Sequence, residues 1–362
     1  MIPSMKKSEY HDRLISYAKE AKRNNHPYPQ RYCFVLTNLC NLACNFCFQE
    51  RKKQEGAMTA KDWIKLASQL PENSRVTLTG GEPVVLKGFE NVFDQVASKF
   101  ECNIITNGIL LDEKLIDFLL SYKKFKVLSI SIDNKNNTIR KSANVQEKNW
   151  DKKWKHVEKM MLYFQKRKKE LNNSECILDS KTVILDENAS ELLDIHKYCV
   201  EDLQCDTHAF QFLKGSPIQH SDLMFKLEKI YEPSRAYKYK NWDVIIDQLD
   251  QIKSYNLKNN KTGYLHPAAA SIIDDTSKIN INYLNEVKHD KAQYKACAAP
   301  WGTVHVNVDG SLFPCLAVSM GNVKNGLKEI IFGKKYKEFK DIIMKNGTVE
   351  ACNRCGWLLP EN

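Results

Sequence analysis

Apolar and polar positions alternate with a strand period directly before segments with a helical period. In residues 31–37 every second residue, from Tyr32 to Leu36, falls on one apolar face, which is the pattern of a half-buried strand. Further along, Thr59 can cap a helix in which apolar residues from Trp63 to Leu70 recur at a spacing of three to four. These two patterns predict a first βα unit.

The same alternation repeats along the first 216 residues. Further strands are expected at Val76–Thr79, Cys102–Thr106, Lys126–Ile132, Ser180–Leu185 and Thr207–Leu213, and further helices near residues 152–170 and 188–199. With the first strand this makes six βα units, two fewer than the eight that close a full barrel. The expected fold class is therefore α/β, with residues 31–216 as its core.

Three other segments complete the expected organisation. Residues 1–30 predict one amphipathic helix packed outside the core, with an apolar face of Leu14, Ile15, Ala18 and Ala21. Residues 217–296 hold two expected helices, near 221–231 and 242–255, and an Asn- and Lys-rich loop that we expect to form a substrate wall. In residues 297–362, two alternating runs flank Asp309-Gly310, a strong hairpin signal.

Three cysteines with a C-x3-C-x2-C spacing, Cys40, Cys44 and Cys47, directly follow the first predicted strand. The gaps fit three thiolates around one iron–sulfur cube. A cluster that only transfers electrons is usually held by four cysteines, so a triplet leaves one iron open for another ligand. The alternative is a zinc knuckle or chance clustering, although zinc takes four nitrogen or sulfur ligands.

This spacing, with Phe46 directly before the third cysteine, resembles that of the radical S-adenosylmethionine (SAM) superfamily. The resemblance implies that SAM chelates the open iron. One electron from the cluster then cleaves SAM to a 5'-deoxyadenosyl radical, which abstracts hydrogen from the substrate. It also implies an open (β/α)6 barrel of the TIM type, a partial barrel whose wide mouth admits a bulky substrate.

Two later loops strengthen the resemblance. Gly80-Gly81-Glu82-Pro83 matches the superfamily's GGEP motif: glycines let backbone carbonyls approach a ligand closely, and Glu82 can accept a charge-assisted hydrogen bond from the methionine ammonium of SAM. The turn that begins with Thr106 and Asn107 is similar to the TNG motif after the third strand. Both loops follow predicted strands, where ligand sites of βα folds gather.

The fourth predicted strand ends at Asp133. The peptide-modifying branch of the superfamily has a related Ser-Ile-Asp followed by an arginine that contacts the SAM carboxylate, and the counterparts here would be Ser131 and Arg140. The continuation DNKNNTIR departs from the family's Asp-Gly pattern. For Asp133, a turn residue with local backbone hydrogen bonds and a contact to ribose or substrate remain equal alternatives.

A second cysteine group, Cys297, Cys315, Cys352 and Cys355, lies near the end of the chain. It resembles the twitch, or shortened SPASM, extension, in which a hairpin and a helix hold one auxiliary 4Fe–4S cluster. Because the chain ends seven residues after Cys355, one auxiliary cluster is expected. A structural zinc site is the alternative, since cysteine spacing does not separate the two metals.

The sixth predicted strand offers one candidate general base, His208. A period of two places either His208 or Gln211 on the inner face, but not both. A histidine can exchange protons near neutral pH, whereas a hydrogen-bonded core histidine is the alternative role.

The chain of 362 residues has a net charge of +10, with basic runs at 152–169 and 235–240. This excess would attract an anionic substrate or an acidic electron donor such as flavodoxin or ferredoxin. No apolar run is long enough to span a membrane and no secretory segment is present, which predicts a reducing, cytoplasmic location. A basic stripe with stacking aromatics is missing, so no nucleic-acid partner is expected.

Two classes of substrate follow from these features. The single auxiliary cysteine group resembles that of twitch-type aminocyclitol dehydrogenases, which favours oxidation of a small polar molecule such as a sugar, aminocyclitol or nucleotide sugar. The alternative is a peptide maturase that forms a crosslink, epimer or thioether. The short N-terminal segment leaves little room for a leader-binding domain, which favours the small molecule. A non-enzymatic scaffold would leave the GGEP turn unexplained.

Overall fold

A ten-stranded sheet organises the computed structural model, with strand order β10-β9-β8-β1-β2-β3-β4-β5-β6-β7. The structure describes residues 9–47, 55–140, 149–213, 239–261, 263–266, 291–314, 319–349, 352, 355 and 357–359. The strands are β1 (Arg31–Val35), β2 (Arg75–Thr79), β3 (Glu101–Thr106), β4 (Phe125–Ser131), β5 (Ile177–Ile184), β6 (Thr207–Phe212), β7 (Gly263–His266), β8 (Thr303–Val306), β9 (Ser311–Phe313) and β10 (Gly321–Asn322). The strands from β8 through β1 to β7 run parallel.

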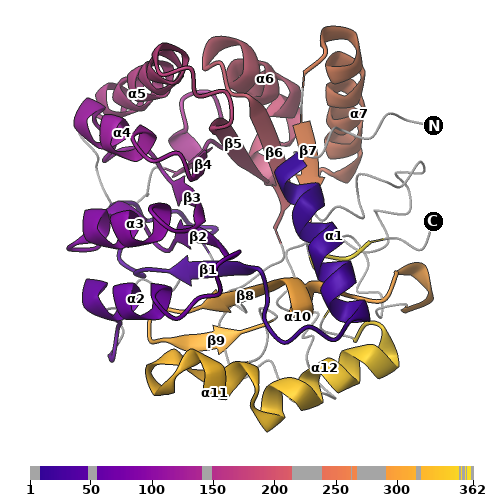
Figure 1. Ribbon diagram of the computed structural model, residues 1–362. Coiled ribbons are helices and arrows are strands. Elements are labelled where there is room, and N and C mark those ends of the chain that lie inside the picture. Colours follow the sequence, from indigo (N-terminus) through magenta and orange to yellow (C-terminus); the bar gives the residue numbers. More distant parts are fainter. Residues whose placement is uncertain are drawn as a thin grey trace.

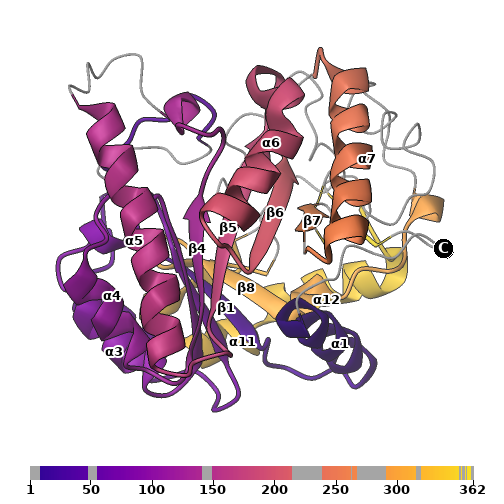
Figure 2. The ribbon, with the colours of Figure 1, turned by 90° about the horizontal axis from the view of Figure 1, so that it is seen from above.

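Helices lie along the outer face of this curved sheet, as the two views show (Figure 1 and Figure 2). The described helices are α1 (Glu9–Arg23), α2 (Ala60–Ala67), α3 (Phe89–Ala97), α4 (Glu113–Leu120), α5 (Trp150–Glu170), α6 (Leu192–Lys197), α7 (Trp242–Asn259), α10 (Ala299–Gly302), α11 (Leu327–Ile331) and α12 (Lys334–Asn346). None of the described helices is both long and apolar enough to cross a lipid bilayer.

The six predicted βα units are confirmed as β1 to β6 with their helices. The alternating residues of β1 pack as expected: Phe34 is fully buried and its ring centroid lies 5.0 Å from that of Trp63 on α2. Thr59 caps α2, and the Thr59 N–H donates to the Asp62 carboxylate over 2.8 Å. This capping box ties the helix start to its first turn.

The parallel sheet is larger than predicted, because β7 and β8 extend it at either side of the six units. The sequence of β7 falls in the segment expected to be a loop. Gly263 explains the difference: a Cβ atom there would lie 3.0 Å from the Asn256 amide nitrogen of α7. The Gly-containing segment therefore lies close to a helix as a strand, although its composition is that of a loop. The expected helix near 221–231 lies outside the described residues.

The predicted C-terminal hairpin is confirmed and joins the barrel sheet. β8 and β9 are antiparallel, and Gly310 takes the positive φ of 92° that their turn requires. On its other side β8 pairs in parallel with β1, with Thr303 opposite Arg31. The end of the expected return strand, including Cys315, lies outside the described residues.

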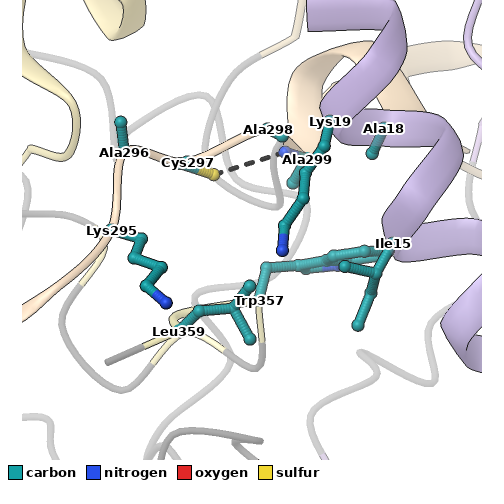
Figure 3. A pocket seen from close by; sticks show the side chains of 10 residues that line it. All are labelled: Ile15, Ala18, Lys19, Lys295, Ala296, Cys297, Ala298, Ala299, Trp357 and Leu359. Atoms are coloured by element: carbon teal, nitrogen blue, oxygen red, sulfur yellow. Dashed lines mark hydrogen bonds between the residues drawn. The ribbon is translucent and has the colours of Figure 1, made fainter. Parts of the chain in front are cut away.

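Helix α1 packs against α10, which precedes β8. Ala18 and Ala21 of its predicted apolar face are buried. A Cβ atom at Gly302 would come within 2.4 Å of the Ala18 methyl carbon, so only glycine permits this approach. The N-terminal helix therefore lies beside the C-terminal cysteine region (Figure 3).

Candidate active site and auxiliary cysteine site

The cysteine triplet lies on the loop that follows β1. Cys40, Cys44 and Cys47 are half-buried and are not joined in disulfides. The Leu42 N–H donates to the Cys40 sulfur over 3.4 Å, and the Cys44 thiol lies 3.7 Å from the Arg140 carbonyl oxygen. The loop offers three cysteine sulfurs, which are the ligand type that iron–sulfur clusters require. The donor set therefore fits a cluster bound by three thiolates.

The GGEP turn packs directly on the base of this loop. A Cβ atom at Gly80 would lie 2.4 Å from the Thr37 carbonyl oxygen, and one at Gly81 would lie 2.3 Å from the Leu39 carbonyl oxygen. The Gly81 N–H donates to the Thr37 carbonyl over 2.6 Å. The glycines were expected to admit a ligand, whereas the backbone that they admit is that of the triplet loop. Pro83 follows, buried, at the start of a short 3-10 helix.

Glu82 is fully buried and joins two loops. Its carboxylate accepts hydrogen bonds from the Thr106 hydroxyl over 2.7 Å and from the Asn107 N–H over 2.8 Å. Both donors belong to the turn that follows β3. The Glu82 carboxylate, expected to meet the SAM ammonium, therefore links the GGEP turn to the Thr106-Asn107 turn.

Burial raises the pKa of Glu82 to about 7, although the hydrogen bonds from Asn107 and Thr106 oppose the shift. The native state then binds a proton more tightly than the unfolded chain, so the free energy of unfolding falls as the pH rises from glutamate's ordinary value of about 4.3 to about 7. In the cluster-free protein, Glu82→Gln is expected to flatten this slope in urea unfolding curves. Glu90→Gln, at an exposed position on α3, is the matched control; an unchanged slope in the Glu82 variant would contradict the assignment.

Asn107 connects the Glu82 hydrogen bonds to the cysteine loop. Its side-chain amide donates to the Asn41 side-chain oxygen over 2.7 Å and lies 3.8 Å from the Cys40 sulfur. Hydrogen bonds to cluster sulfurs tune a cluster's potential. Asn107, expected as a SAM contact, is thus also placed to orient the cysteine loop.

Asp133 and Arg140 form an ion pair beside the triplet. The Arg140 Nε atom lies 2.5 Å from the Asp133 carboxylate, whose other oxygen accepts from the Val183 N–H over 2.7 Å. The Arg140 guanidinium carbon lies 5.4 Å from the centroid of the Phe46 ring, within cation–π range. Burial raises the pKa of Asp133, and the Arg140 charge opposes that shift. Asp133 is therefore an internal anchor that holds Arg140 against the triplet loop.

Two buried asparagines, which the sequence analysis did not single out, shape the loop that follows β4. The Asn137 side chain accepts from the Asp133 N–H over 2.9 Å and donates to the Ser131 carbonyl over 3.1 Å. The Asn188 amide donates to the Asp133 carbonyl over 2.8 Å. The positive φ of 50° at Asn137 is the kind of turn that an Asn-Asn pair favours. Asn188 carries no such signal, because its partner is 55 residues away.

His208 lies on the side of the sheet that α6 and α7 cover. Its ring stacks on that of His196 of α6, with centroids 5.2 Å apart, and its Nε2 atom lies 2.8 Å from the Thr182 hydroxyl. His196 in turn bonds to Asn256 of α7 over 2.6 Å. Burial lowers the pKa of His208 well below its usual range. This placement does not support the expected general base, because the side chain is fully buried in the helical layer while Gln211 points to the exposed side.

Backbone hydrogen bonds bring the C-terminal cysteine segments together. The Cys297 N–H donates to the Gly347 carbonyl at the end of α12 over 2.9 Å. Two residues later the Val349 N–H donates to the Cys352 sulfur over 3.4 Å, and the Cys355 N–H donates to the Cys352 carbonyl. The three described cysteines thus belong to one region, and their thiols are the donors that a second cluster needs.

Two family models match the chain over these sites. Residues 34–199 match the radical SAM superfamily and contain the triplet, the GGEP turn and the Asp133–Arg140 pair. Residues 297–356 match SPASM, an iron–sulfur cluster-binding domain, and contain the four C-terminal cysteines. The chain therefore contains a radical SAM domain and a SPASM iron–sulfur domain. These two domains confirm SAM and 4Fe–4S clusters as its cofactors.

Individual relatives add detail. The chain is 32% identical over 123 residues to the antilisterial bacteriocin subtilosin biosynthesis protein AlbA of Bacillus subtilis, and 34% identical over 107 residues to the sporulation killing factor maturation protein SkfB of the same species. These matches cover 33% and 28% of this chain, and only 28% and 26% of the relatives. The crystal structure of SuiB from Streptococcus suis superposes with a TM-score of 0.60 at 16% identity, over 93% of this chain and 74% of that one. This likeness supports the partial-barrel fold.

Proposed function

We propose that this chain is a peptide maturase. Such a radical SAM enzyme abstracts hydrogen from a precursor peptide, and the peptide radical then forms a crosslink, an epimer or a thioether. The observation that carries this proposal is the identity of 32% and 34% with AlbA and SkfB, whose names state bacteriocin biosynthesis and killing-factor maturation. SuiB, which has the same fold, has been solved with its precursor peptide SuiA bound.

A peptide substrate replaces the small polar molecule that the auxiliary cysteine layout favoured. The cysteines Cys297, Cys315, Cys352 and Cys355 concern only the metal group that this domain holds. Their spacing carries no information on what enters the barrel, because the substrate meets other residues. For the choice of substrate, the similarity to these relatives is therefore stronger evidence than the spacing of the cysteines.

In this proposal Cys40, Cys44 and Cys47 hold the first cluster, and the four C-terminal cysteines hold the second. Reductive cleavage of SAM at the first cluster supplies the 5'-deoxyadenosyl radical. The chain's own contribution is to fix the loops around that site. Glu82 and Asn107 bind the β2 and β3 loops to the cysteine loop.

Arg140 is the residue placed to bind an anionic group of SAM. Asp133 pairs with its Nε atom, and the Arg140 guanidinium carbon lies 5.4 Å from the centroid of the Phe46 ring. These two contacts restrict where the guanidinium lies. A carboxylate is the group that this fork binds best, which agrees with the SAM contact expected for Arg140.

Deuterium transfer tests the proposal. Anaerobically reconstituted protein, reduced flavodoxin and SAM are mixed with candidate precursor peptides, chosen from any short open reading frames found beside this gene and made with deuterated amino acids. We expect deuterium in 5'-deoxyadenosine and a mass change in the peptide. A deuterated aminocyclitol is the matched alternative substrate. Transfer from the aminocyclitol, with none from the peptide, would overturn the proposal in favour of a small-molecule oxidation.

A further inference from the structure

Two buried histidines on neighbouring elements bond directly to each other. The Nδ1 atoms of His196 on α6 and His208 on β6 lie 3.0 Å apart, and both side chains are fully buried. Burial lowers the pKa of His196 to about 4 and that of His208 well below its usual range, so both rings are neutral at neutral pH. Since a neutral imidazole carries a single N–H, one Nδ1 atom donates and the other accepts.

A threonine hydroxyl connects His208 to the end of β4. The Thr182 hydroxyl of β5 donates to the Ile132 carbonyl, and its oxygen lies 2.8 Å from the His208 Nε2 atom. In a continued parallel ladder the Val183 N–H would donate to that carbonyl, but it donates to the Asp133 carboxylate instead. The Thr182 hydroxyl therefore holds the carbonyl directly before Asp133, beyond the last pair of the β4–β5 ladder.

The direction of this hydroxyl fixes the proton positions along the chain of side chains. A hydroxyl has one proton to donate, so Thr182 can hold the Ile132 carbonyl only while it accepts from the His208 Nε2–H. A neutral His208 ring then accepts at Nδ1, which requires the Nδ1–H of His196. The His196 ring in turn accepts at Nε2, so the Asn256 side chain of α7 has to present its amide nitrogen there.

The Asn256 amide is the end of the chain that can adapt. Its oxygen lies 2.6 Å from the His196 Nε2 atom, while its nitrogen is buried without a hydrogen-bond partner among the described residues. Turning the amide over exchanges the two atoms and gives the nitrogen a partner. With the oxygen toward neutral His196, both rings would instead take the opposite tautomers. The Thr182 proton would then go to His208, and the Ile132 carbonyl would lose its donor.

The chain ends beside the ion pair that faces the cysteine triplet. Asp133 directly follows Ile132 and pairs with Arg140, whose guanidinium carbon lies 5.4 Å from the centroid of the Phe46 ring. The Ile132 carbonyl is part of the backbone that carries Asp133, so its displacement moves the Asp133 carboxylate and with it Arg140. The two histidines are buried in the helical layer, and their influence on this pair passes through the Thr182 hydroxyl.

We propose that His196 and His208 are positioning residues for SAM binding. Their tautomers direct the Thr182 hydroxyl to the carbonyl before Asp133 and thereby keep Arg140 in place. The inference rests on the SAM contact proposed for Arg140 and adds to it the buried residues that hold this contact. Because all the hydrogen bonds of the chain reverse together, a buried amide on α7 is coupled to the SAM site.

Ring nitrogen signals test the tautomers directly. Full-length, reconstituted protein is made with isotope-labelled histidine for nitrogen NMR, and the two buried residues are assigned from the signals lost in His196→Gln and His208→Gln. We expect a protonated Nε2 and an unprotonated Nδ1 in His208, and the opposite arrangement in His196. The opposite tautomer of His208 at neutral pH, or a charged ring, would overturn the inference.

Two substitutions of His208 test the effect on SAM binding. In His208→Gln the side-chain amide reaches the place of Nε2 and can still donate to Thr182, whereas in His208→Asn it reaches only the place of Nδ1. Both variants lose the imidazole. In equilibrium dialysis with reconstituted protein, the Kd for SAM is expected to rise about fivefold or more in His208→Asn and less than about twofold in His208→Gln. Equal Kd values in the two variants would contradict the proposal.

Thr182 supplies an independent pair of variants. Thr182→Val removes the hydroxyl at nearly constant volume and should raise the Kd for SAM, whereas Thr182→Ser should restore it. Ser180→Ala removes a fully buried hydroxyl from the same face of β5, so it is the matched control and should bind SAM normally. Iron content is measured for every variant to show that the clusters are retained. An equal loss of SAM binding in the Ser180 control would overturn the inference.

A double-mutant cycle shows whether Thr182 acts through Arg140. Arg140→Met alone should weaken SAM binding, and Thr182→Val added to it should have no further effect on the Kd. A merely structural role for Thr182 would give additive effects instead, and that result would overturn the inference.

The failure of this inference and of the proposed function give different results. If Arg140→Met binds SAM as the unchanged protein does, the SAM contact of Arg140 falls and the positioning role falls with it. If peptide is modified while His208→Asn and His208→Gln bind SAM equally, the maturase function stands and the histidines are not positioning residues. If the tautomers and Kd values are as expected but deuterium transfer comes only from the aminocyclitol, the positioning role stands and the maturase function falls.

Discussion

Replacing Cys44 with alanine is expected to abolish SAM cleavage and to lower the iron content from about eight to about four atoms per chain. Two remaining thiolates cannot hold the cluster that SAM needs, whereas the C-terminal cysteines stay intact. The measurements are an iron count after anaerobic reconstitution and an assay for 5'-deoxyadenosine.

Two matched variants define what this result means. Cys33→Ala removes a buried thiol on β1 that belongs to neither cysteine group, and should keep both iron and SAM cleavage. Cys355→Ala should lose a similar amount of iron but continue to cleave SAM. Full iron content and normal cleavage in the Cys44 variant would show that the triplet is not the catalytic cluster site.

Asp133→Ala is expected to lower the free energy of unfolding by about 3–5 kcal/mol, the cost of leaving a buried charge without its partner. The Asp133 carboxylate is fully buried and pairs with Arg140, and its removal also takes away the acceptor of the Val183 N–H. Urea unfolding of the cluster-free protein measures the change. SAM binding should weaken as well, because Arg140 is no longer held beside Phe46.

The controls separate stability from SAM binding. Asp250→Ala, on the exposed face of α7, should change stability little. The Asp133→Leu/Arg140→Met variant removes both charges, so it should recover part of the lost stability while SAM binding stays weak. A fully stable Asp133→Ala variant would contradict the role of the ion pair as an anchor.

The sequence could predict most of the core, because one signal repeats in it. Each of β1 to β6 alternates apolar residues and is followed by a helical pattern. The order and the type of these elements could therefore be predicted. β7 could not, since its four residues lie in an Asn- and Lys-rich segment and become a strand only by pairing with β6. Local pattern carries no information on such distant contacts.

For the site, motifs indicate which residues come together but not what each touches. The sequence singles out the GGEP glycines as ligand contacts, whereas their close partner in the structure is the Thr37 to Leu39 backbone. For His208, a period of two shows which residues share a face but not which face the helices cover. The bonding of Asn188 to Asp133 joins loops far apart in the sequence, so only the folded chain reveals it.

The pairing of β8 with β1 has a mechanical consequence for the barrel. Every strand from β9 to β6 has a neighbour on both sides, so displacing any of them breaks two ladders of hydrogen bonds. Among the described strands, β7 pairs with β6 alone, so displacing β7 breaks only one short ladder of hydrogen bonds. Among the parallel strands, β8 and β1 to β7, the sheet is therefore most easily displaced at β7, and elastic widening of the barrel mouth would concentrate there.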